Sequence, residues 1–396
     1  MSAPRIAVVS AVRTPIGRYL GGLSTLPAPE LGVVAAKAAL AAAKVAAEDV
    51  DVAYFGQARQ AGSRPNPARQ VAIGAGIPQS SHATTLNVAC ASGMKAIQAA
   101  ADDLLLGRAT VALAGGIESM SRVPFLLDRM RTGYRLGHAK IVDNMYQDGF
   151  QCPLADMIMG ETAELLAQEM NISREQQDEF ALQSQQKAKA AVDAGYFESQ
   201  LAPVTVTTRK GEVIVDADEH LRPDTSLQSL AKLPGVFADE NGTVTPGNAS
   251  GITDGAAALV LMTEAEADAR GLQPLAFLAA SQMVGTDPKR MGLGPVPATQ
   301  QLLEKNGWTL ADFGLFELNE AFAAQVLACQ QQLSMPSDLL NVNGGAIALG
   351  HPIGCTGARI VVTLLHEMKR RGTNRGLATL CVSGGLGMTT AWDLAC

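Results

Sequence analysis

The sequence predicts an α/β fold in which helices and sheets pack in layers. Apolar runs of strand length alternate with longer helix-like stretches along the 396 residues. This alternation is typical of buried, largely parallel sheets whose strands are connected by helices. Glycine and alanine are abundant, and aromatic residues make up only 4% of the chain. Because small side chains let layers stack closely, we expect layers rather than an open, loop-rich fold.

Short apolar runs and helical periodicity indicate the individual elements. The first expected helix is alanine-rich and spans residues 31–45. The expected strands span residues 5–10, 110–114, 256–262 and 377–382. The second of these runs is followed at once by Gly115 and Gly116, which predicts that the strand ends there.

Residues 121–247 differ from the rest of the chain. They are more polar, hold several Met and Gln residues and carry a helical run at 174–194. We expect this segment to be an insertion that lies over the α/β body. Within it, residues 129–140 are locally basic, which fits either a solvated loop or a subunit contact.

A weak internal duplication relates the two ends of the chain. Residues 90–97 and 355–361 each lead from a small-residue turn into a helix, a strand and a pair of glycines. Two similar halves would bring two helix N-termini together at a pseudo-dyad.

Composition limits the partners of the protein. The formal charge of −7 disfavours phosphate binding, so we expect no nucleic acid. No run is long and apolar enough to span a membrane, and no basic segment followed by a long apolar stretch opens the chain. We therefore expect a cytoplasmic protein with reduced thiols. None of the six cysteines has CxxC or zinc-ligand spacing, so we expect no metal.

Cys90 is the first candidate catalytic residue. Residues 86–89 are apolar and extended, whereas residues 94–105 have helical periodicity, so Cys90 lies at a strand-to-helix junction. Free N–H groups and the helix dipole favour a thiolate at such a position. The alternative is a small buried core cysteine.

His351 lies among glycines and precedes a proline. Glycine lets the backbone approach a ligand closely, and imidazole is the usual base that activates a thiol. The alternative is a histidine whose hydrogen bonds are satisfied within a tight loop.

Two further positions combine polar chemistry with a strand end. Cys381 ends an apolar run and leads into a glycine loop whose N–H groups could point at an oxyanion. Asn319 follows another apolar run and precedes a helix, where it is either an N-cap or a polar ligand group.

Together these segments resemble the thiolase family. The resemblance is carried by four motifs in the family order, Cys90-Ala-Ser-Gly93, Asn319-Glu-Ala-Phe322, Gly350-His-Pro-Ile-Gly354 and Cys381-Val-Ser-Gly384. It extends over essentially the whole chain. It implies a five-layered αβαβα body of two similar halves, residues 1–267 and 268–396, with a loop domain inserted at about 121–247. It also implies a homodimer or a dimer of dimers, the second of which is a homotetramer.

The resemblance implies a role for each motif residue. Cys90 is similar to the nucleophile that takes up the acyl group, and His351 to its base and a donor to one oxyanion hole. Cys381 is similar to the second acid/base, and Asn319 to the residue that holds a water in that hole. The N–H groups of Cys90 and Ser383 would form the other hole.

The resemblance also implies that the substrates are acyl-CoA and CoA, with no further cofactor. By family position, the expected contacts to substrate and CoA are Met159, Arg222, Ser229, Ser250 and Phe322. Without the resemblance, Arg222 reads as a surface charge and the serines as caps or turn hydroxyls.

This sequence departs from the family pattern in the binding region. Ile158 stands where many short-chain members have histidine, which leaves room for longer acyl chains. Ser383 replaces a glycine, so its side chain could crowd the oxyanion hole or restrict φ. Pro246 stands where a small residue is common.

These features lead to one preferred function. The resemblance implies an acetyl-CoA C-acetyltransferase that condenses two acetyl-CoA to acetoacetyl-CoA and CoA through an acyl-Cys90 intermediate. The main alternative is a 3-ketoacyl-CoA thiolase of fatty-acid β-oxidation. A decarboxylating condensing enzyme would usually replace Cys381, and a non-catalytic acyl-CoA-binding protein would tolerate the loss of Cys90 or His351.

Overall fold

The computed structural model describes residues 4–238 and 241–395. A ten-stranded mixed sheet runs through the molecule, and β1 divides it. In order across the sheet the strands are β14 (Leu315–Leu318), β15 (Arg375–Val382), β16 (Leu386–Leu394), β13 (Ala276–Gly285), β1 (Ile6–Arg13), β12 (Thr253–Thr263), β5 (Val111–Ser119), β3 (Val52–Gly56) and β4 (His82–Leu86), with β2 (Gly17–Arg18) on β12. β1 pairs with β12 along its length but with β13 only over residues 6–8. The sheet therefore splits at β1 into two halves.

Eleven α-helices accompany the sheet in the described part of the chain. They are α1 (Ala28–Ala43), α2 (Pro67–Gly74), α3 (Ser92–Leu105), α4 (Met159–Glu169), α5 (Arg174–Asp193), α6 (Leu227–Ala231), α7 (Glu264–Ala269), α8 (Pro295–Asn306), α9 (Ala323–Leu333), α10 (Ala346–Leu349) and α11 (Ile353–Arg371).

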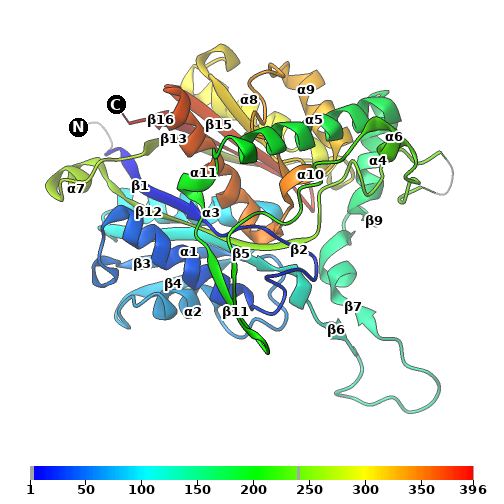
Figure 1. Ribbon diagram of the computed structural model, residues 1–396, viewed down its shortest axis with the longest axis horizontal. Coiled ribbons are helices and arrows are strands. Elements are labelled where there is room, and N and C mark those ends of the chain that lie inside the picture. Colours follow the sequence, from blue (N-terminus) through cyan, green and yellow to red (C-terminus); the bar gives the residue numbers. More distant parts are fainter. Residues whose placement is uncertain (1–3, 239–240, 396) are drawn as a thin grey trace.

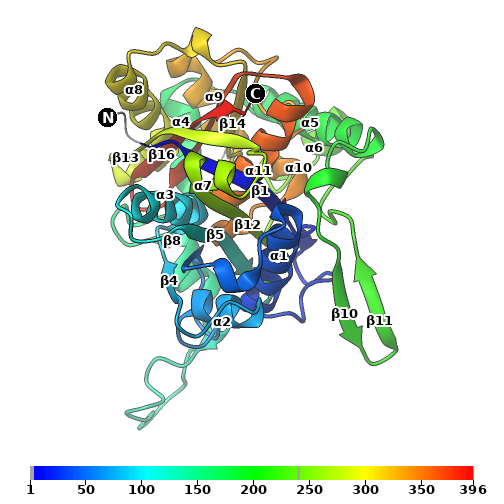
Figure 2. The ribbon, with the colours of Figure 1, turned by 90° about the vertical axis from the view of Figure 1, so that its left-hand side faces the viewer.

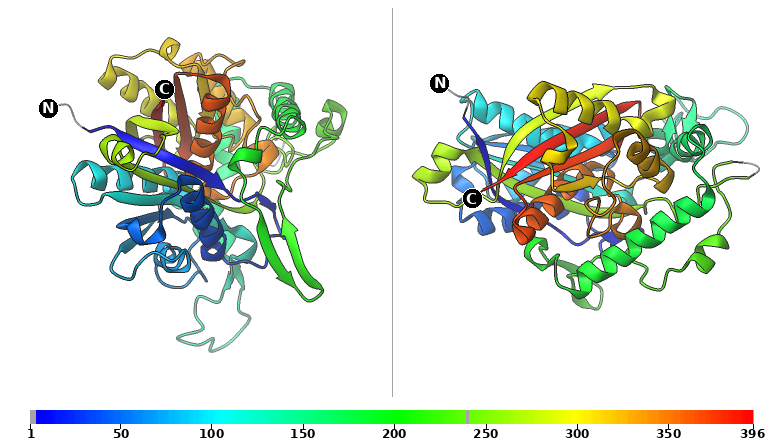
Figure 3. Two further views of the ribbon diagram at one scale, coloured as in Figure 1. Left: turned by 60° about the vertical axis from the view of Figure 1, so that its left-hand side comes forward. Right: turned by 90° about the horizontal axis from the view of Figure 1, so that it is seen from above.

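The helices and the two halves of the sheet alternate in five layers, which confirms the predicted αβαβα body (Figure 1). α1 and α2 cover one half of the sheet, and α8 and α9 cover the other. α3 and α11 lie between the two halves, where their apolar residues pack on both. A view from above shows the two sheet halves crossing over these central helices (Figure 3).

The prediction of largely parallel strands is wrong. Only β14–β15, β3–β4 and β3–β5 are parallel pairs, and the other pairs along the sheet are antiparallel. Helices cover both faces of each half, so the strands are apolar throughout whichever way they run. The apolar runs therefore indicated burial but carried no information about strand direction.

The prediction that a strand ends before Gly115 is also wrong, because β5 continues through both glycines to Ser119. A Cβ on Gly115 would lie 2.0 Å from the carbonyl oxygen of Ala257, and one on Gly116 would lie 2.3 Å from that of Gly354. These glycines permit close backbone contact inside the sheet rather than ending a strand.

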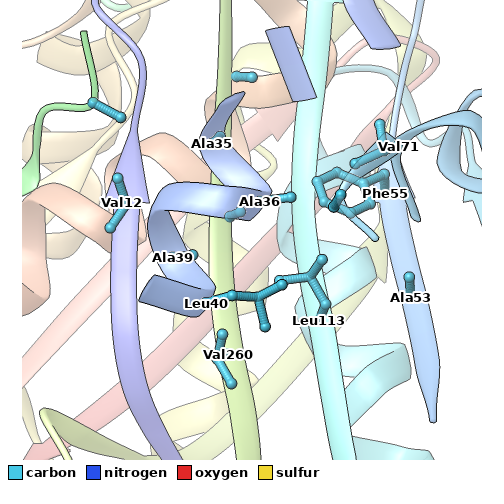
Figure 4. Close-up of a cluster of buried hydrophobic side chains, with 14 of the residues drawn as sticks. Val12, Ala35, Ala36, Ala39, Leu40, Ala53, Phe55, Val71, Leu113 and Val260 are labelled. Atoms are coloured by element: carbon cyan, nitrogen blue, oxygen red, sulfur yellow. The ribbon is translucent and has the colours of Figure 1, made fainter. Parts of the chain in front are cut away.

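Small residues bring α1 close to the sheet. The helix begins after Pro27 and ends at Lys44, whose φ is 55°. Ala35, Ala36 and Ala39 are fully buried over β12 and β5, as Figure 4 shows beside Val260 and Leu113. The alanine-rich run thus forms a helix as predicted, and its small side chains set the short distance between layers.

The central helices contact each other through glycines. A Cβ on Gly93 of α3 would lie 2.8 Å from the backbone nitrogen of Ala358, and one on Gly357 of α11 would lie 2.6 Å from that of Met94. Each helix therefore presents a glycine to the backbone of the other. This reciprocal contact places the two helix starts side by side, as the internal duplication predicted.

The inserted segment wraps the edge of this body. α5 begins at the predicted position with a Ser173–Gln176 capping box and crosses the molecule (Figure 1). A buried two-point ion pair joins the insertion to β1, with Arg13 nitrogens 2.7 and 2.8 Å from the Asp218 oxygens. The short strands of the segment are β6 (Phe125–Leu126), β7 (Val142–Asp143), β8 (Gln151–Cys152), β9 (Met157–Ile158), β10 (Val204–Thr208) and β11 (Gly211–Val215).

Two parts of the insertion project from the body. The loop between β6 and β7 contains the basic residues 129–140, and the β10–β11 hairpin projects separately, on the other side of the view in Figure 2. Leu136 in the loop is 97% exposed. Whether residues 129–140 form a solvated loop or a subunit contact stays a prediction. Among the described residues, no helix has the length and apolar character needed to cross a membrane.

Candidate active site

A cavity of about 240 Å³ lies where the starts of α3 and α11, the end of β15 and the insertion meet. Most of the residues predicted for the site line it. These are Cys90, Met159, Ser250, Phe322, His351, Cys381 and Ser383. The structure therefore brings together motifs that lie far apart in the sequence.

A strained turn positions Cys90. The chain leaves β4 and makes a short helical turn at residues 89–91 before α3 begins at Ser92. Ala89 has a φ of 43°, a conformation that a non-glycine residue rarely adopts. The Ser92 hydroxyl holds the turn by donating to the Ala89 carbonyl oxygen at 2.6 Å and accepting from the Val88 N–H at 2.9 Å. The strand-to-helix junction predicted for Cys90 is confirmed.

Opposing effects act on the Cys90 thiol. Burial raises its pKa, while the Arg59 cation and the N–H groups of Ser383 and of Cys90 itself favour the thiolate. Burial prevails, so the resting group is a thiol. The two N–H groups point at the sulfur, from which an acyl carbonyl would extend.

His351 is a neutral imidazole with a defined tautomer. Burial and the nearby cations Arg359 and Arg59 lower its pKa to about 3. Its Nδ1 lies 2.6 Å from the Thr356 hydroxyl, which donates its one proton to the Pro352 carbonyl oxygen at 3.0 Å. With the hydroxyl proton on Pro352, Nδ1 carries the ring proton and donates it to Thr356. Nε2 is left as a free acceptor.

Cys381 lies near the end of β15 and is 1% exposed. Its pKa is raised well above the ordinary range, first by burial and then by the proximity of Cys90. Two neighbouring thiolates would repel each other, so only one of the two groups ionises at a time. The pair can therefore act as one acid and one base.

Asn319 does not cap a helix, so that interpretation is wrong. α9 begins only at Ala323, because Phe322 is still extended and bridges to Ala249. Asn319 is 1% exposed and lies outside the cavity lining. Both polar atoms of its side chain lack a hydrogen-bond partner. This leaves the amide available to a polar group of the site.

The binding wall is largely apolar. Met159 opens α4, and Phe322 packs edge-on against Phe237 with ring centroids 6.3 Å apart. Ile158 and Pro246, the two departures in this region, also line the cavity. An apolar wall fits an acyl chain or the pantetheine arm of CoA.

The Ser383 side chain causes no backbone strain. Positive φ values fall on the next two residues, Gly384 at 86° and Gly385 at 82°, and Ser383 is not among the residues with positive φ. The turn after β15 thus obtains its unusual geometry from glycine and keeps the Ser383 N–H directed at the site.

Arg222 and Ser229 lie outside the cavity and are exposed. The Ser229 hydroxyl takes part in a capping box at the start of α6, where it accepts the Ser226 N–H at 3.0 Å. In the structure Ser229 therefore acts as a helix-capping residue. A CoA contact at either residue stays a prediction.

Sequence reasoning missed several lining residues, among them Arg59, Tyr146, Phe150 and Phe237. Arg59 follows the buried strand β3 at its carboxyl end, a location that could have marked it as a site residue. Tyr146 and Phe150 come from a turn of π-helix in the insertion and Phe237 from a loop, and no local pattern in either signals a site.

Comparison with protein families matches this arrangement. The model described as thiolase, N-terminal domain, covers residues 6–265, and the one described as thiolase, C-terminal domain, covers residues 272–393. The chain belongs to the thiolase family. It is thus an acyltransferase enzyme. The alternative of a non-catalytic acyl-CoA-binding protein is excluded.

Individual thiolases are similar along their whole length. The acetyl-CoA acetyltransferase of Chromobacterium violaceum is 51% identical over 387 residues, 98% of each chain. The crystal structure of the Bacillus anthracis acetyl-CoA acetyltransferase superposes with a TM-score of 0.97 at 44% identity, covering 99% of each chain. Human mitochondrial 3-ketoacyl-CoA thiolase in complex with CoA gives 0.96 at 41% identity, covering 100% of this thiolase and 99% of the human chain.

Proposed function

We propose that this thiolase is an acetyl-CoA C-acetyltransferase that reversibly condenses two acetyl-CoA to acetoacetyl-CoA and CoA. The observation that carries the proposal is the shared cavity of Cys90, His351 and Cys381. Similarity to acetyl-CoA acetyltransferases at about half of all positions supports the choice of acyl group.

The first half-reaction charges the enzyme. His351 Nε2 accepts the Cys90 proton as the thiolate attacks the carbonyl carbon of acetyl-CoA. The N–H groups of Cys90 and Ser383, which point at the sulfur, stabilise the negative oxygen beside it. CoA leaves with a proton from Cys381, which becomes a thiolate, while His351 keeps the Cys90 proton on Nε2. The acetyl group remains on Cys90.

The second half-reaction forms the carbon–carbon bond. Cys381 removes a proton from the methyl group of a second acetyl-CoA. The resulting enolate oxygen is stabilised by His351 together with a water held by the Asn319 amide. The carbanion then attacks the acetyl-Cys90 carbonyl, and Cys90 leaves as a thiolate that recovers its proton from His351. Together the half-reactions make a ping-pong scheme.

The reaction needs only CoA thioesters, because the thiols and imidazole supply all the acid–base chemistry. We therefore propose that the enzyme uses no metal or other cofactor. We also propose that it works in the cytoplasm as a homodimer or dimer of dimers, with the projecting loop at 127–141 as a contact surface. The exposed Leu136 in that loop supports a contact.

A 3-ketoacyl-CoA thiolase acting on longer chains is the second candidate. Ile158 favours it, because this apolar side chain lines the cavity where many short-chain members have histidine. The close structural match to human mitochondrial 3-ketoacyl-CoA thiolase is consistent with it.

Thiolysis kinetics separate the two candidates. The purified enzyme is assayed with 3-oxoacyl-CoA substrates of increasing chain length, and kcat/KM is compared. We expect the maximum at four carbons. A maximum at a longer chain would favour the second candidate, and full turnover by a Cys90→Ala variant would contradict the mechanism itself.

A further inference from the structure

Two buried glutamates outside the cavity hold the segment that carries His351. Glu118 and Glu320 are 0% and 1% exposed, and neither lines the cavity. The reaction scheme above gives neither side chain a part. Because removing a carboxylate from water is costly, each has to be stabilised by donors inside the protein. The groups that supply those donors show what the two side chains hold in place.

Glu118 joins the end of β3 to the start of α11. It lies one residue before the end of β5 and accepts the N–H groups of Ala58 at 3.1 Å and Arg59 at 3.2 Å, both just beyond β3. The same carboxylate accepts the N–H of Gly354 at 2.8 Å. Gly354 is the second residue of α11, so its N–H is one of the donors that the helix itself leaves free. A carboxylate at this end of a helix is also favoured by the helix dipole.

Glu320 does the same for the preceding helix. It accepts the N–H of Ile347, the second residue of α10, at 3.1 Å and the Ser184 hydroxyl at 2.7 Å. Ser184 in turn accepts the N–H of Gly345, just before α10, at 3.1 Å. Asn341 donates to the other oxygen of Glu320 at 2.9 Å. The start of α10 is therefore fixed to this carboxylate both directly and through a serine.

His351 lies in the short link between these two helices. Residues 350–352 alone separate the end of α10 from the start of α11. Gly350 has a φ of 102°, and the His351 N–H donates to the Gly251 carbonyl oxygen at 3.0 Å. The helix on each side of the link is thus held by a buried carboxylate, one from β5 and one from the segment after β14.

The main chain packs closely around both carboxylates. A Cβ on Gly345 would lie 2.3 Å from the carboxyl carbon of Glu320, and one on Gly354 would lie 2.6 Å from the Ala58 nitrogen. Backbone that packs this closely leaves little room for either helix start to shift. The position of the link therefore depends on the hydrogen bonds that the two glutamates accept.

The charge of Glu118 also acts on the nucleophile. Burial raises the pKa of Glu118, whereas the Arg59 cation and the three N–H donors lower it. Glu118 raises the pKa of the Cys90 thiol, and Arg59 lowers it. The other titratable groups at Cys90 are Cys381, which is a thiol at rest, and the neutral imidazole of His351. Glu118 and Arg59 thus oppose each other at the nucleophile.

We propose that Glu118 and Glu320 are positioning residues of the reaction, which fix the helix starts on either side of residues 350–352 and so hold the His351 imidazole in place for proton transfer with Cys90. The inference rests on the proposed thiolase chemistry, in which Nε2 of His351 has to meet the Cys90 proton. A displacement of about 1 Å at a reacting group can slow a reaction about 100-fold. The hydrogen bonds of two carboxylates far apart in the sequence therefore bear directly on turnover.

The test removes each carboxylate in two steps. In Glu118→Gln and Glu320→Gln the amide oxygen can still accept the helix N–H, while another donor loses its acceptor. In Glu118→Ala and Glu320→Ala all of these donors lose their acceptor. In thiolysis of acetoacetyl-CoA we expect kcat to fall about 3- to 10-fold in the glutamine variants and about 100-fold in the alanine variants. KM should stay unchanged, because neither side chain belongs to the binding wall.

Asp51→Asn is the matched control. The Asp51 carboxylate accepts the N–H groups of Thr110 at 2.7 Å and Val111 at 3.1 Å, where β5 begins, whereas Glu118 lies near the end of that strand. This variant should keep the wild-type kcat. Thermal melting shows which variants are folded at the assay temperature, and where an alanine variant is not, the glutamine variant of the same residue decides. A folded alanine variant or, in its place, a glutamine variant with the wild-type kcat would overturn the proposal, as would a change confined to KM.

A second measurement separates positioning from general damage to the fold. The rate of Cys90 alkylation by iodoacetamide is followed as a function of pH. Glu118→Gln removes a negative charge that opposes the thiolate, so its profile should move to lower pH. Glu320→Gln should leave the profile in place, because Glu320 packs at the start of α10 on the other side of the link. An unshifted profile in Glu118→Gln, or an equal shift in both variants, would overturn the assignment of Glu118.

The substrate range separates this inference from the proposed function. If the wild-type enzyme thiolyses only longer 3-oxoacyl-CoA substrates, the acetyltransferase proposal fails, and the variants are compared with the substrate that is used. The alkylation profiles do not depend on that choice. If acetoacetyl-CoA is thiolysed and every folded variant keeps the wild-type kcat, the acetyltransferase proposal stands and the positioning role fails.

Discussion

The hydroxyl of Thr356 determines which nitrogen of His351 can act as a base. It accepts the Nδ1 proton at 2.6 Å and donates to Pro352 at 3.0 Å, both within the buried interior. Thr356→Val keeps the side-chain shape but removes this acceptor. The Nδ1–H would then be buried without a partner.

The size of the effect follows from the cost of that unpaired donor. A buried donor without an acceptor costs about 1–3 kcal/mol. The ring avoids this cost by moving its proton to Nε2, where it can no longer accept the Cys90 proton. The reactive tautomer, and with it kcat/KM, should fall about 5- to 150-fold. Because the pKa of His351 is lowered to about 3, the ring is neutral throughout pH 6–8 and the deficit should not change with pH.

The assay is thiolysis of acetoacetyl-CoA at several pH values in this range, together with the rate of Cys90 alkylation by iodoacetamide. Thr356→Ser is the matched control, since it restores the hydroxyl and should restore both rates. A Thr356→Val variant with the wild-type kcat/KM, or one whose deficit disappears on raising the pH, would refute the tautomer argument.

Three further substitutions test the site and its frame. Cys381→Ala should still take an acetyl group onto the nucleophile, visible by intact mass, while condensation slows about 10²- to 10⁴-fold; loss of acetylation would contradict the division of roles. Asn319→Leu should lower kcat, and an unchanged kcat would exclude a role in the oxyanion hole. The free energy of unfolding should stay equal or rise by about 1–3 kcal/mol, because the substitution removes two unpartnered polar atoms from the core. Gly93→Ala should cost about 1–3 kcal/mol in urea denaturation, because its Cβ would lie 2.8 Å from a backbone nitrogen of α11, whereas Gly285→Ala, with nothing within 4 Å, should be neutral.

The sequence predicted best those features that depend on neighbouring residues. Cys90 at a strand-to-helix junction and Cys381 near a strand end follow from short local patterns, and both were found where expected. Strand direction was predicted wrongly, because it depends on which distant strands pair. The prediction that Asn319 caps a helix was wrong for a related reason. Phe322 is extended and pairs with Ala249, so α9 begins only at Ala323.

Residues that line the cavity from distant segments were the hardest to predict. Arg59 follows a strand end, Gly149 lies in a turn of π-helix and Phe237 in a loop, and they share a cavity only in three dimensions. The unusual feature of Arg59 is a buried Nε without a hydrogen-bond partner. That property belongs to its surroundings and has no counterpart in the adjacent sequence.

The electrostatic coupling of the two thiols imposes an order on the half-reactions. Whenever Cys90 is a thiolate, its charge opposes ionisation of Cys381, whose pKa is already raised by burial. Once Cys90 carries an acyl group it holds no charge, so the repulsion disappears and only burial opposes the second ionisation. Cys381 therefore ionises more readily, and is more often available as the base, when an acceptor is in place. Premature formation of a carbanion, with no thioester to attack, is disfavoured by the same charge that makes Cys90 a nucleophile.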